Sequence, residues 1–598
     1  MGALAVVVLT AGFWRGWQLE EYALFRADQA RDAYLAKDVL DNGWGHFKLL
    51  GPKAGASVII DDIKSAFKLG PVYHYFQYIG VGLLGEANIF ALLLVDWILS
   101  LASIGLFYIL LRNFFNKKIS LLTTILFAFS YILTVYSRFA WNINQIVFWE
   151  LLVSVSILKV LMGIKNKNNC NEWILKQKQR CWWFLMMIFS LVVVSQLHIL
   201  SAIVFAFIFG VMFLIYRPRI NWHCWFGGII IILVLYAPMI ISDVYNQGDN
   251  FKRLLTASSA EKVAEGTFGK KIWKLSQFHG KNYMLILTGI NKYDYKKIAI
   301  VGDWFIILTL ILLRISLFQK ELLGVREIRK KIRQIFTSRE RKYMIKRALK
   351  INSRQKRFLI VVSLWFFIFM IMYFRILPRL HKERYWLLIA PLPFIFMAFW
   401  FYLIDRLGVF YNKYIANGVI GIIFIFILFS NLTATINFYK SLEKGDLVAS
   451  KYHQKIILGP YRFFTGYGEM KRIVDYMSAS VVDGQASALC FKSMEYQNKL
   501  GFEYLLDVHY PKIKYEQTSD GKDYDCVFYV ITKTSREDRE LKDFKLDYEI
   551  GDKKTFKSLT VWELKVKNNK IKKQEVLLKQ KVNNKDGRVI YWKDLFNK

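Results

Sequence analysis

The sequence predicts an all-α membrane domain with many transmembrane helices, followed by a small soluble domain at the C-terminus. Of the 598 residues, 55% are hydrophobic, and they come in long blocks. A block of about twenty apolar residues can cross a bilayer as a helix. Counting the apolar start 1–14, we expect about 11 or more transmembrane helices. The other predicted spans are 88–111, 119–136, 146–164, 181–198, 199–216, 222–242, 297–318, 357–377, 385–404 and 414–436.

Positive charge is concentrated in the loops that we expect in the cytoplasm. The formal net charge of +37 would by itself suggest a nucleic-acid partner, because basic proteins attract phosphate backbones. Many Lys and Arg residues lie in short loops between apolar blocks, however, as the positive-inside rule predicts for a membrane protein. We therefore expect a multi-pass plasma-membrane protein and no nucleic-acid partner. The basic loops are 112–118, 165–180, 217–219 and 320–357.

The loops between these basic ones are expected to face outward. They are 16–87, 137–145, 243–296 and 378–384. The first of them follows Trp14-Arg15-Gly16-Trp17, which is typical of the interfacial end of a span. The single N-glycosylation sequon, Asn431-Leu432-Thr433, falls inside a predicted span. This scarcity favours a bacterial membrane over one of the secretory pathway.

Residues 439–598 are expected to form an extracytoplasmic soluble domain, distinct from a membrane domain 1–438. Segment 467–477 has the apolar spacing of a helix, and ASALCF, YDCVFYVI and KSLTVWEL are typical of short strands. The domain is therefore predicted to be α/β or α+β. Cys490 and Cys526 each lie in a strand-like run. A disulfide between them and two buried thiols fit the sequence equally well.

The long outer loop 16–87 carries more carboxylates than a simple connection needs. Asp28, Asp32 and Asp38 recur at partly helical spacing with apolar residues between them. This pattern predicts an amphipathic helix lying along the membrane. A solvated acidic face is the simplest interpretation of these three residues.

Polar and basic residues also gather in the other predicted outer segments. An isolated ionisable residue at the end of a span usually extends into the headgroups. A group of cations on the outer side opposes the positive-inside trend, and an anionic ligand would explain it, because Arg contacts phosphate with two hydrogen bonds. Together with an outer carboxylate acting as a base, these cations predict chemistry on a lipid-phosphate substrate. The residues are Arg138, Asn142, His198, Lys382 and Arg384.

Five segments, given at the end of this paragraph in their order along the chain, resemble segments of the GT-C superfamily of polyprenyl-phosphate-dependent glycosyltransferases. The nearest branch is the bacterial group related to protein O-mannosyltransferases and the aminoarabinose transferase of lipid A. The resemblance covers about residues 1–400. It implies a GT-C-like fold and an inverting transfer of a sugar from a polyprenyl phosphate to a hydroxyl or amine of a glycan, lipid or protein outside the membrane. The segments are DQARDAY (28–34), LLGP (49–52), GPVYHYF (70–76), SRFAWNIN (137–144) and RYWLLIAPLP (384–393).

The resemblance also implies catalytic roles in the first outer loop. Asp28 matches the family's catalytic Asp and is therefore expected to be the general base. Gln29 stands where that family often has Glu. A second acidic residue is common later in the loop, and either Asp61 or Asp62 fits that place.

Substrate-binding roles follow from the remaining matches. Arg138 and Arg384 match basic positions near the donor phosphate, and Tyr385 stands beside the second. GPVYHYF matches a stretch packed against the membrane face, so Tyr73 and His74 are expected to be structural or substrate-lining. Asn142 and Lys382, which accompany these cations, complete the predicted binding set.

Two alternatives remain open from the sequence. A transporter or flippase of lipid-linked sugars is the main rival function, but such proteins often contain internal repeats and polar groups at mid-membrane. Here no repeat is visible, and the charges concentrate at the outer ends of spans. Some relatives bind a divalent metal, and His198 with a loop carboxylate would be the candidate ligands, although one His without a spaced partner predicts a metal weakly. No other cofactor is expected.

Overall fold

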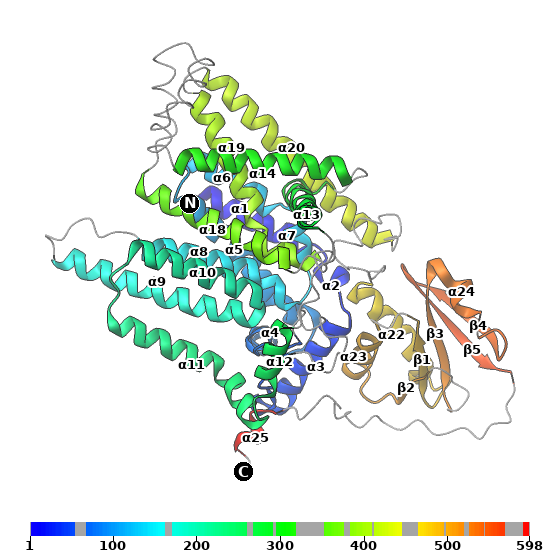
Figure 1. Cartoon of the computed structure of the whole chain (residues 1–598). Helices are drawn as coiled ribbons and strands as arrows, with labels where there is room; N and C mark the ends of the chain where they lie inside the picture. The colour runs from blue at the N-terminus through cyan, green and yellow to red at the C-terminus, as the bar shows by residue number, and fades with distance from the viewer. Residues whose placement is uncertain are drawn as a thin grey trace.

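The computed structural model has a helical body that extends to Lys444 and a smaller sheet-containing domain after it (Figure 1). The structure describes residues 2–53, 67–161, 170–259, 267–290, 295–317, 352–375, 383–408, 412–444, 465–494, 498–518, 525–542, 544–567 and 590–596.

The helical body consists of long helices joined by short 3₁₀ turns. The α-helices are α1 (Gly2–Gly16), α2 (Leu19–Tyr22), α3 (Ala27–Asn42), α4 (Val72–Leu84), α5 (Ile89–Leu111), α6 (Lys117–Ala128), α7 (Tyr131–Tyr136), α8 (Ile146–Val160), α9 (Cys170–Leu197), α10 (Ile199–Tyr216), α11 (Trp222–Tyr245), α12 (Asp249–Ser259), α13 (Phe268–Thr288), α14 (Tyr295–Leu317), α18 (Ser353–Arg375), α19 (Pro391–Gly408) and α20 (Lys413–Lys444). The 3₁₀ turns used below are η1 (Trp44–His46), η4 (Asn142–Gln145) and η6 (Glu383–Ile389).

The described part of the chain contains 8 helices that are long and apolar enough to cross a membrane. They correspond to eight of the ten predicted spans after the first segment, which confirms a multi-pass membrane protein. That first segment forms α1, a shorter apolar helix of 15 residues. The eight spans are Ile89–Leu111, Asn142–Val160, Gln177–Leu197, Ile199–Tyr216, Trp222–Tyr245, Ser353–Tyr373, Trp386–Gly408 and Lys413–Glu443.

The predicted span 119–136 is not one helix, because the chain breaks between α6 and α7. Ser130 Oγ donates to the carbonyl of Ile286 at 3.1 Å, and the amide of Tyr131 donates to Asn431 Oδ1 at 2.9 Å. Backbone polar groups freed by a break need partners from neighbouring helices in an apolar interior. The break is therefore stabilised by residues far away in the sequence. The predicted span 297–318 is the single helix α14, which carries several charged residues and does not count among the eight.

Burial separates central from peripheral helices. Within the spans containing α8 and α19, 83% of the residues are buried, whereas the values are 17% for α11 and 22% for α20. The helices α8 and α19 thus form the centre of the bundle. The helices α11 and α20 present large apolar side chains outward, as lipid-facing helices do. Aromatic rings fill the centre, for example Phe107 stacked on Phe127 with centroids 4.3 Å apart.

The C-terminal domain contains a five-stranded mixed sheet in the order β2-β1-β3-β5-β4. β1 is parallel to β2 and β3, while β5 is antiparallel to β3 and β4. The predicted helix and all three predicted strands are confirmed. The sequence did not indicate β2, which has only three residues. It did not indicate β4 either, because this edge strand is mostly exposed and its residues show no apolar alternation. The elements are α22 (Tyr467–Val482), β1 (Leu489–Ser493), α23 (Lys499–His509), β2 (Tyr515–Gln517), β3 (Val527–Lys533), α24 (Glu537–Leu541), β4 (Tyr548–Thr555), β5 (Leu559–Val566) and α25 (Lys593–Phe596).

Two disulfides are present. Cys490 and Cys526 are joined, with Cα atoms 5.7 Å apart, so the disulfide alternative is the correct one of the two. Cys181 on α9 and Cys224 on α11 form a second bridge, with Cα atoms 5.6 Å apart, which the sequence did not predict. The spacing of 43 residues between them gives no signal, since helix packing alone brings them together.

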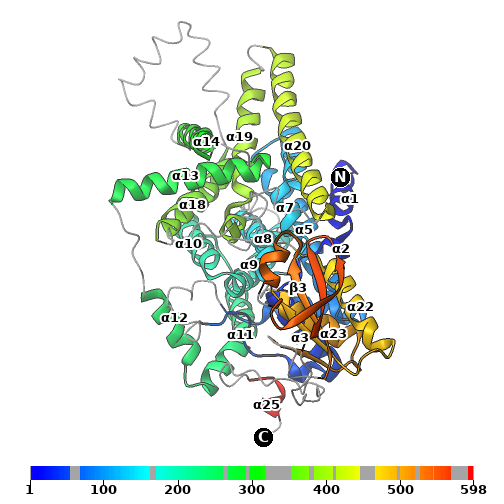
Figure 2. The same ribbon diagram turned by 90° about the vertical axis from the view of Figure 1, so that its right-hand side faces the viewer.

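The C-terminal domain packs against α2 and α3 of the helical body (Figures 1 and 2). Phe25, just before α3, packs against the rings of Tyr467 and Tyr504, with ring centroids 5.3 and 5.4 Å apart. The hydroxyl of Tyr34 donates to Asp507 at 2.6 Å. Apolar residues of both parts form one continuous buried cluster. The predicted division at 438/439 falls inside α20, and the helical body and the sheet-containing domain share a hydrophobic interface.

The other end of the soluble domain returns to the first loop. Leu49 donates its amide to the carbonyl of Ile590 at 3.1 Å, and Trp592 donates its amide to the carbonyl of Phe47 at 3.1 Å. The indole of Trp592 also donates to the hydroxyl of Tyr75 on α4 at 3.1 Å. The last described residues thus lie beside η1 and the start of α4.

Glu21 on α2 forms the ionic part of this interface. Arg472 donates to its carboxylate twice, at 2.7 and 2.8 Å, and Lys557 donates at 2.7 Å. The backbones are also close, because a Cβ atom at Gly466 would lie 2.5 Å from the Glu21 carbonyl oxygen. The hydrogen bonds from Arg472 and then Lys557 outweigh partial burial and lower the pKa of Glu21 to about 2.

We predict that Glu21→Gln weakens the attachment of the C-terminal domain. At neutral pH the unfolding midpoint of the purified protein should fall by the equivalent of about 1 kcal/mol, as for a favourable partly exposed ion pair. The lowered pKa means that the carboxylate stabilises the fold above its unfolded pKa of about 4.3. This contribution disappears as the pH falls towards about 2, so wild type and variant should converge in acid.

The control is Glu20→Gln, which removes the neighbouring exposed carboxylate. Thermal unfolding followed by intrinsic fluorescence across pH measures all three proteins. Equal midpoint changes for the two variants at neutral pH would contradict the role of Glu21.

Candidate functional site

The helix α3 carries the first candidate residues and is tied to the outer turn 137–145. Gln29, buried in the first turn of α3, accepts from the Arg26 amide at 3.2 Å. Its own amide donates to the carbonyl of Ala140 at 2.9 Å. The amide thus both caps α3 and links it to the turn, a pair of contacts that a Glu carboxylate could not make because it has no donor. The segments 28–34 and 137–144, far apart in the sequence, meet here.

Three charged residues of α3 have different environments. Arg31 lies between Asp28, at 3.1 Å, and Asp32, at 2.7 Å. The side chain of Asp28 is 59% exposed, whereas that of Asp32 is 3% exposed. Burial opposes the charge on Arg31, but the two carboxylates outweigh it and raise the pKa of Arg31. The simple interpretation of one solvated acidic face is therefore wrong, because Asp32 is buried in an ion pair and Asp28 is open.

Asp96 on α5 connects two further segments, α4 and the turn 137–145. Its carboxylate accepts from the side chain of Gln145, from the amide of Trp141 at 3.3 Å and from the hydroxyl of Tyr73 at 3.3 Å. The Tyr73 oxygen in turn accepts from Gln77 at 3.1 Å. This buried carboxylate therefore holds GPVYHYF and SRFAWNIN together. Sequence reasoning missed Asp96, although a single carboxylate inside the apolar run IFALLLVDWILS is the signal that could have found it.

Tyr73 and His74 lie in the electrostatic neighbourhood of the charged residues of α3. Both are buried. Burial, followed by the charges of Asp96 and Asp32, raises the pKa of Tyr73. Burial lowers the pKa of His74, and its ring contacts the side chain of Gln77 at 3.4 Å. Their expected structural or substrate-lining role stays a prediction.

Lys48 adds a cation that sequence reasoning did not select. Burial, and then the charges of Lys68 and Arg31, lower the pKa of Lys48. The following residues LLGP lie beside GPVYHYF, because the amide of Gly51 donates to the carbonyl of Leu69 at 2.8 Å. A Cβ atom at position 51 would lie 2.1 Å from the Gly70 carbonyl oxygen, so only glycine permits this approach. A run of basic and glycine residues after an acidic helix was the available signal for Lys48.

The side chain of Arg138 contacts the end of α1 and does not contact the ion pair of Asp28 and Arg31. It is 2% exposed and donates to the carbonyls of Arg15 at 2.6 Å and Gln18 at 3.2 Å. It also donates to the Tyr439 hydroxyl at 3.3 Å. Burial lowers the pKa of Arg138, and the neighbouring Tyr439 opposes that shift. Its predicted position near a phosphate is untested.

Arg15 itself is buried among helices. It is 1% exposed and donates to the carbonyls of Ser100 and Ala128, each at 2.9 Å. The expectation that Trp14-Arg15-Gly16-Trp17 ends a span at the membrane interface stays a prediction, and the structure adds that the Arg15 side chain lies against other helices.

The remaining candidates are only partly described. Asn142 donates to the carbonyl of Leu197 at 2.9 Å, which links η4 to the corner where His198 precedes α10. Among the described residues, no group of three or more His, Cys, Asp or Glu side chains could hold a metal ion. Arg384 and Tyr385 lie in η6, which packs against η4 and α8, but their side chains are not described. Asp61, Asp62 and Lys382 lie outside the described residues.

No family model and no curated relative matches the sequence. The apo structure of ArnT from Cupriavidus metallidurans is similar over 94% of this chain and 97% of its own, with 12% identical residues and a TM-score of 0.42. ArnT bound to undecaprenyl phosphate has 11% identical residues, the same coverage of 94% and 97%, and a TM-score of 0.40.

An archaeal oligosaccharyltransferase is also similar in structure. AglB from Archaeoglobus fulgidus, in complex with an inhibitory peptide and a dolichol-phosphate, is similar over 89% of this chain and 70% of its own, with 9% identity and a TM-score of 0.42.

Proposed function

We propose that the chain is an integral membrane glycosyltransferase that transfers a sugar from a polyprenyl-phosphate donor to a hydroxyl or amine on the outer face of the membrane, with inversion. The observation that carries the proposal is the environment of Asp28. This carboxylate is 59% exposed, in the first turn of a helix that is otherwise held on both sides. An accessible carboxylate on a rigid support suits a base that must meet an acceptor from solution.

The residues around Asp28 leave it in a defined position. Gln29 fixes the start of α3 through Ala140, and Arg31 contacts Asp28 while paired with the buried Asp32. The guanidinium group of Arg31 is therefore held against the surface of α3, where it orients the Asp28 carboxylate. In the proposed reaction, Asp28 takes the proton of the acceptor as its oxygen or nitrogen attacks the sugar carbon, while the bond to the lipid phosphate breaks.

The departing phosphate needs positive charge as the bond to the sugar breaks. Lys48, on which the charge of Arg31 acts, is proposed to contribute such charge. Arg384, Lys382 and Tyr385 are proposed to bind the donor phosphate, and Asn142 and Arg138 to contribute from the turn 137–145. Tyr73 and His74 are proposed to line the substrate.

Further parts of the proposal rest on the sequence. Asp61 or Asp62 is proposed as the second carboxylate of the first loop. The acceptor is a glycan, a lipid or a protein. A divalent metal at His198 is not required by the proposed mechanism. The C-terminal domain, which packs on α3, is proposed to lie on the same outer side as Asp28.

We predict that Asp28→Asn abolishes transfer while the protein still folds. Loss of a general base costs roughly 10²–10⁴-fold in rate, and an exposed carboxylate contributes little to stability. The assay follows consumption of polyprenyl-phosphate sugars by the purified protein in nanodiscs. The matched control is Asp41→Asn, which removes another half-exposed carboxylate of α3 that pairs with Lys37 at 3.0 Å. Wild-type turnover by Asp28→Asn would exclude Asp28 as the base.

We also predict that Arg384→Ala weakens donor binding more than acceptor binding, because only the donor carries the phosphate. The measured quantities are the KM values for the two substrates and kcat. Arg406→Ala, at the exposed far end of the neighbouring helix α19, is the control. Equal increases in both KM values would count against a phosphate-binding role. Movement of labelled lipid across the membrane without transfer or hydrolysis would instead support a flippase.

A further inference from the structure

Two buried arginines of neighbouring segments have no carboxylate partner within the described residues. Arg15 and Arg138 are 1% and 2% exposed. Within the described ranges, the hydrogen bonds of their guanidinium groups end on backbone carbonyls and on the hydroxyl of Tyr439. The two residues are also directly linked, because Arg138 donates to the carbonyl of Arg15 at 2.6 Å. A buried charge normally requires a partner of opposite charge.

The helix ends nearby compensate part of this charge. Arg15 donates to the carbonyl of Ala128, the last residue of α6, and Arg138 donates near the end of α1. A helix C-terminus carries roughly half a negative elementary charge. At Arg15, the end of α6 supplies about half a negative charge against one positive charge. About half a positive charge is therefore left at Arg15.

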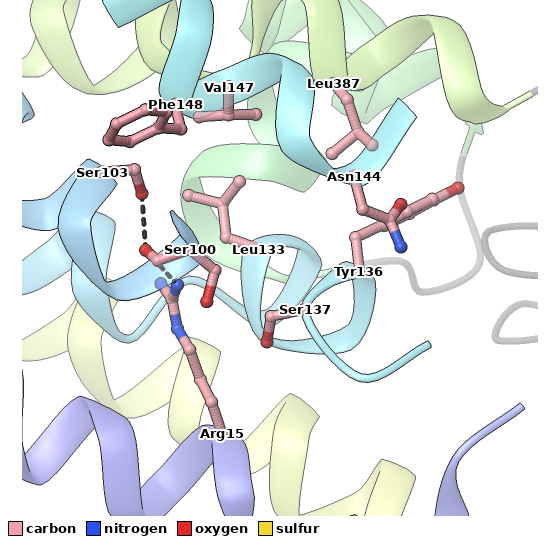
Figure 3. A pocket seen from close by; sticks show the side chains of 10 residues that line it. All are labelled: Arg15, Ser100, Ser103, Leu133, Tyr136, Ser137, Asn144, Val147, Phe148 and Leu387. Carbon is pink, nitrogen blue, oxygen red and sulfur yellow. Dashed lines mark hydrogen bonds between the residues drawn. The ribbon is translucent and has the colours of Figure 1, made fainter. Parts of the chain in front are cut away.

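A pocket lies directly against Arg15 (Figure 3). The side chain of Arg15 extends from α1 towards Ser100, and Ser103 lies beyond it, while Val147, Phe148, Leu133 and Leu387 provide apolar walls. None of the lining residues is acidic. We call this space the Arg15 pocket, and it is lined by Arg15, Ser100, Ser103, Leu133, Tyr136, Ser137, Asn144, Val147, Phe148 and Leu387.

One donor of Arg15 is not used by the protein. The terminal nitrogens of its guanidinium group bind the Ser100 and Ala128 carbonyls, but the buried Nε atom has no hydrogen-bond partner. An unmet charged donor costs more than an unmet neutral one. The serine hydroxyls can turn to donate to a bound ion. Ser103 and Ser137 at present donate to carbonyls of their own helices, at 2.6 and 2.8 Å.

We propose that the Arg15 pocket binds one small inorganic anion of the charge and size of chloride. Charge selects an anion, because the pocket contains an incompletely compensated cation and no acidic residue lines it. Size selects a small ion, because the free space accommodates about one water-sized particle and is too narrow for a phosphate ester. The ion would neutralise the junction of α1, α5, α7 and η4. This site is independent of the proposed transfer reaction.

The test is the thermal unfolding of the full-length purified protein while chloride replaces gluconate at constant ionic strength. A ligand that binds the folded state raises the midpoint with increasing concentration. We expect chloride and bromide to raise it by a few degrees along a saturable curve. No response to either halide, or a response to phosphate or polyprenyl phosphate alone, would overturn the proposal.

Variants localise the effect to the pocket. Arg15→Gln should abolish the chloride response, but it also removes two carbonyl contacts and so could impair folding. Val147→Leu keeps Arg15 and adds a methylene to the pocket wall, and it should reduce chloride affinity at least about tenfold if the ion is excluded by size. The control Arg357→Gln removes an arginine that also contacts a carbonyl and a tyrosine ring, but far from this pocket. Arg357→Gln should respond like wild type, and an unchanged response in Val147→Leu would refute this location.

A direct observation complements the unfolding experiment. Crystals grown in bromide should show an anomalous peak beside Arg15, and bromide peaks confined to other positions would refute the site. Neither measurement uses activity. Failure of the anion-site proposal would therefore not contradict the proposed glycosyltransferase function, and failure of that function would not contradict the anion site.

Discussion

The hydrogen bonds of Arg138 to the carbonyls of Arg15 and Gln18 are the constraint on which the candidate site depends. They join the end of α1 and the start of α2 to the turn 137–145. Because these groups are buried, breaking the contact would leave an unpaired charge and unpaired carbonyls in an apolar interior. The path of the chain from α1 into α3 is therefore fixed relative to the bundle. Asp28 acquires its position from this path.

The helix α3 is held between two different kinds of neighbour. On the side of the bundle, polar contacts dominate: Gln29 reaches Ala140, and Asp96 connects Tyr73 with Trp141. On the side of the C-terminal domain, aromatic packing around Phe25 and the ion pairs of Glu21 dominate. A soluble domain that merely followed the membrane part would not need such an interface. Its contacts with α2 and α3 indicate that it supports the geometry of the candidate site.

Local patterns predicted most of the elements and failed where tertiary contacts override them. Long apolar blocks identified eight spans, and short strand-like runs identified β1, β3 and β5. The break between α6 and α7 was not predictable, because Asn431 and the Ile286 carbonyl, which stabilise it, are distant in sequence. β4 lies at the sheet edge, where exposed side chains leave no periodic signal. The disulfide from Cys181 likewise depends on the packing of two helices.

The sequence by itself determined the class of protein, the number and order of most spans, and the segments that meet at the site. Periodicity and charge placement suffice for these properties because they act over short stretches of chain. Only the tertiary structure decided that Asp28 is exposed while Asp32 is buried, that Arg15 lies inside the bundle, and that Asp96 connects the segments. Exposure and hydrogen bonding depend on residues far away along the chain, as for Arg15 and Ala128 with a separation of 113 or Lys557 and Glu21 with a separation of 536. No local pattern records such distant partners.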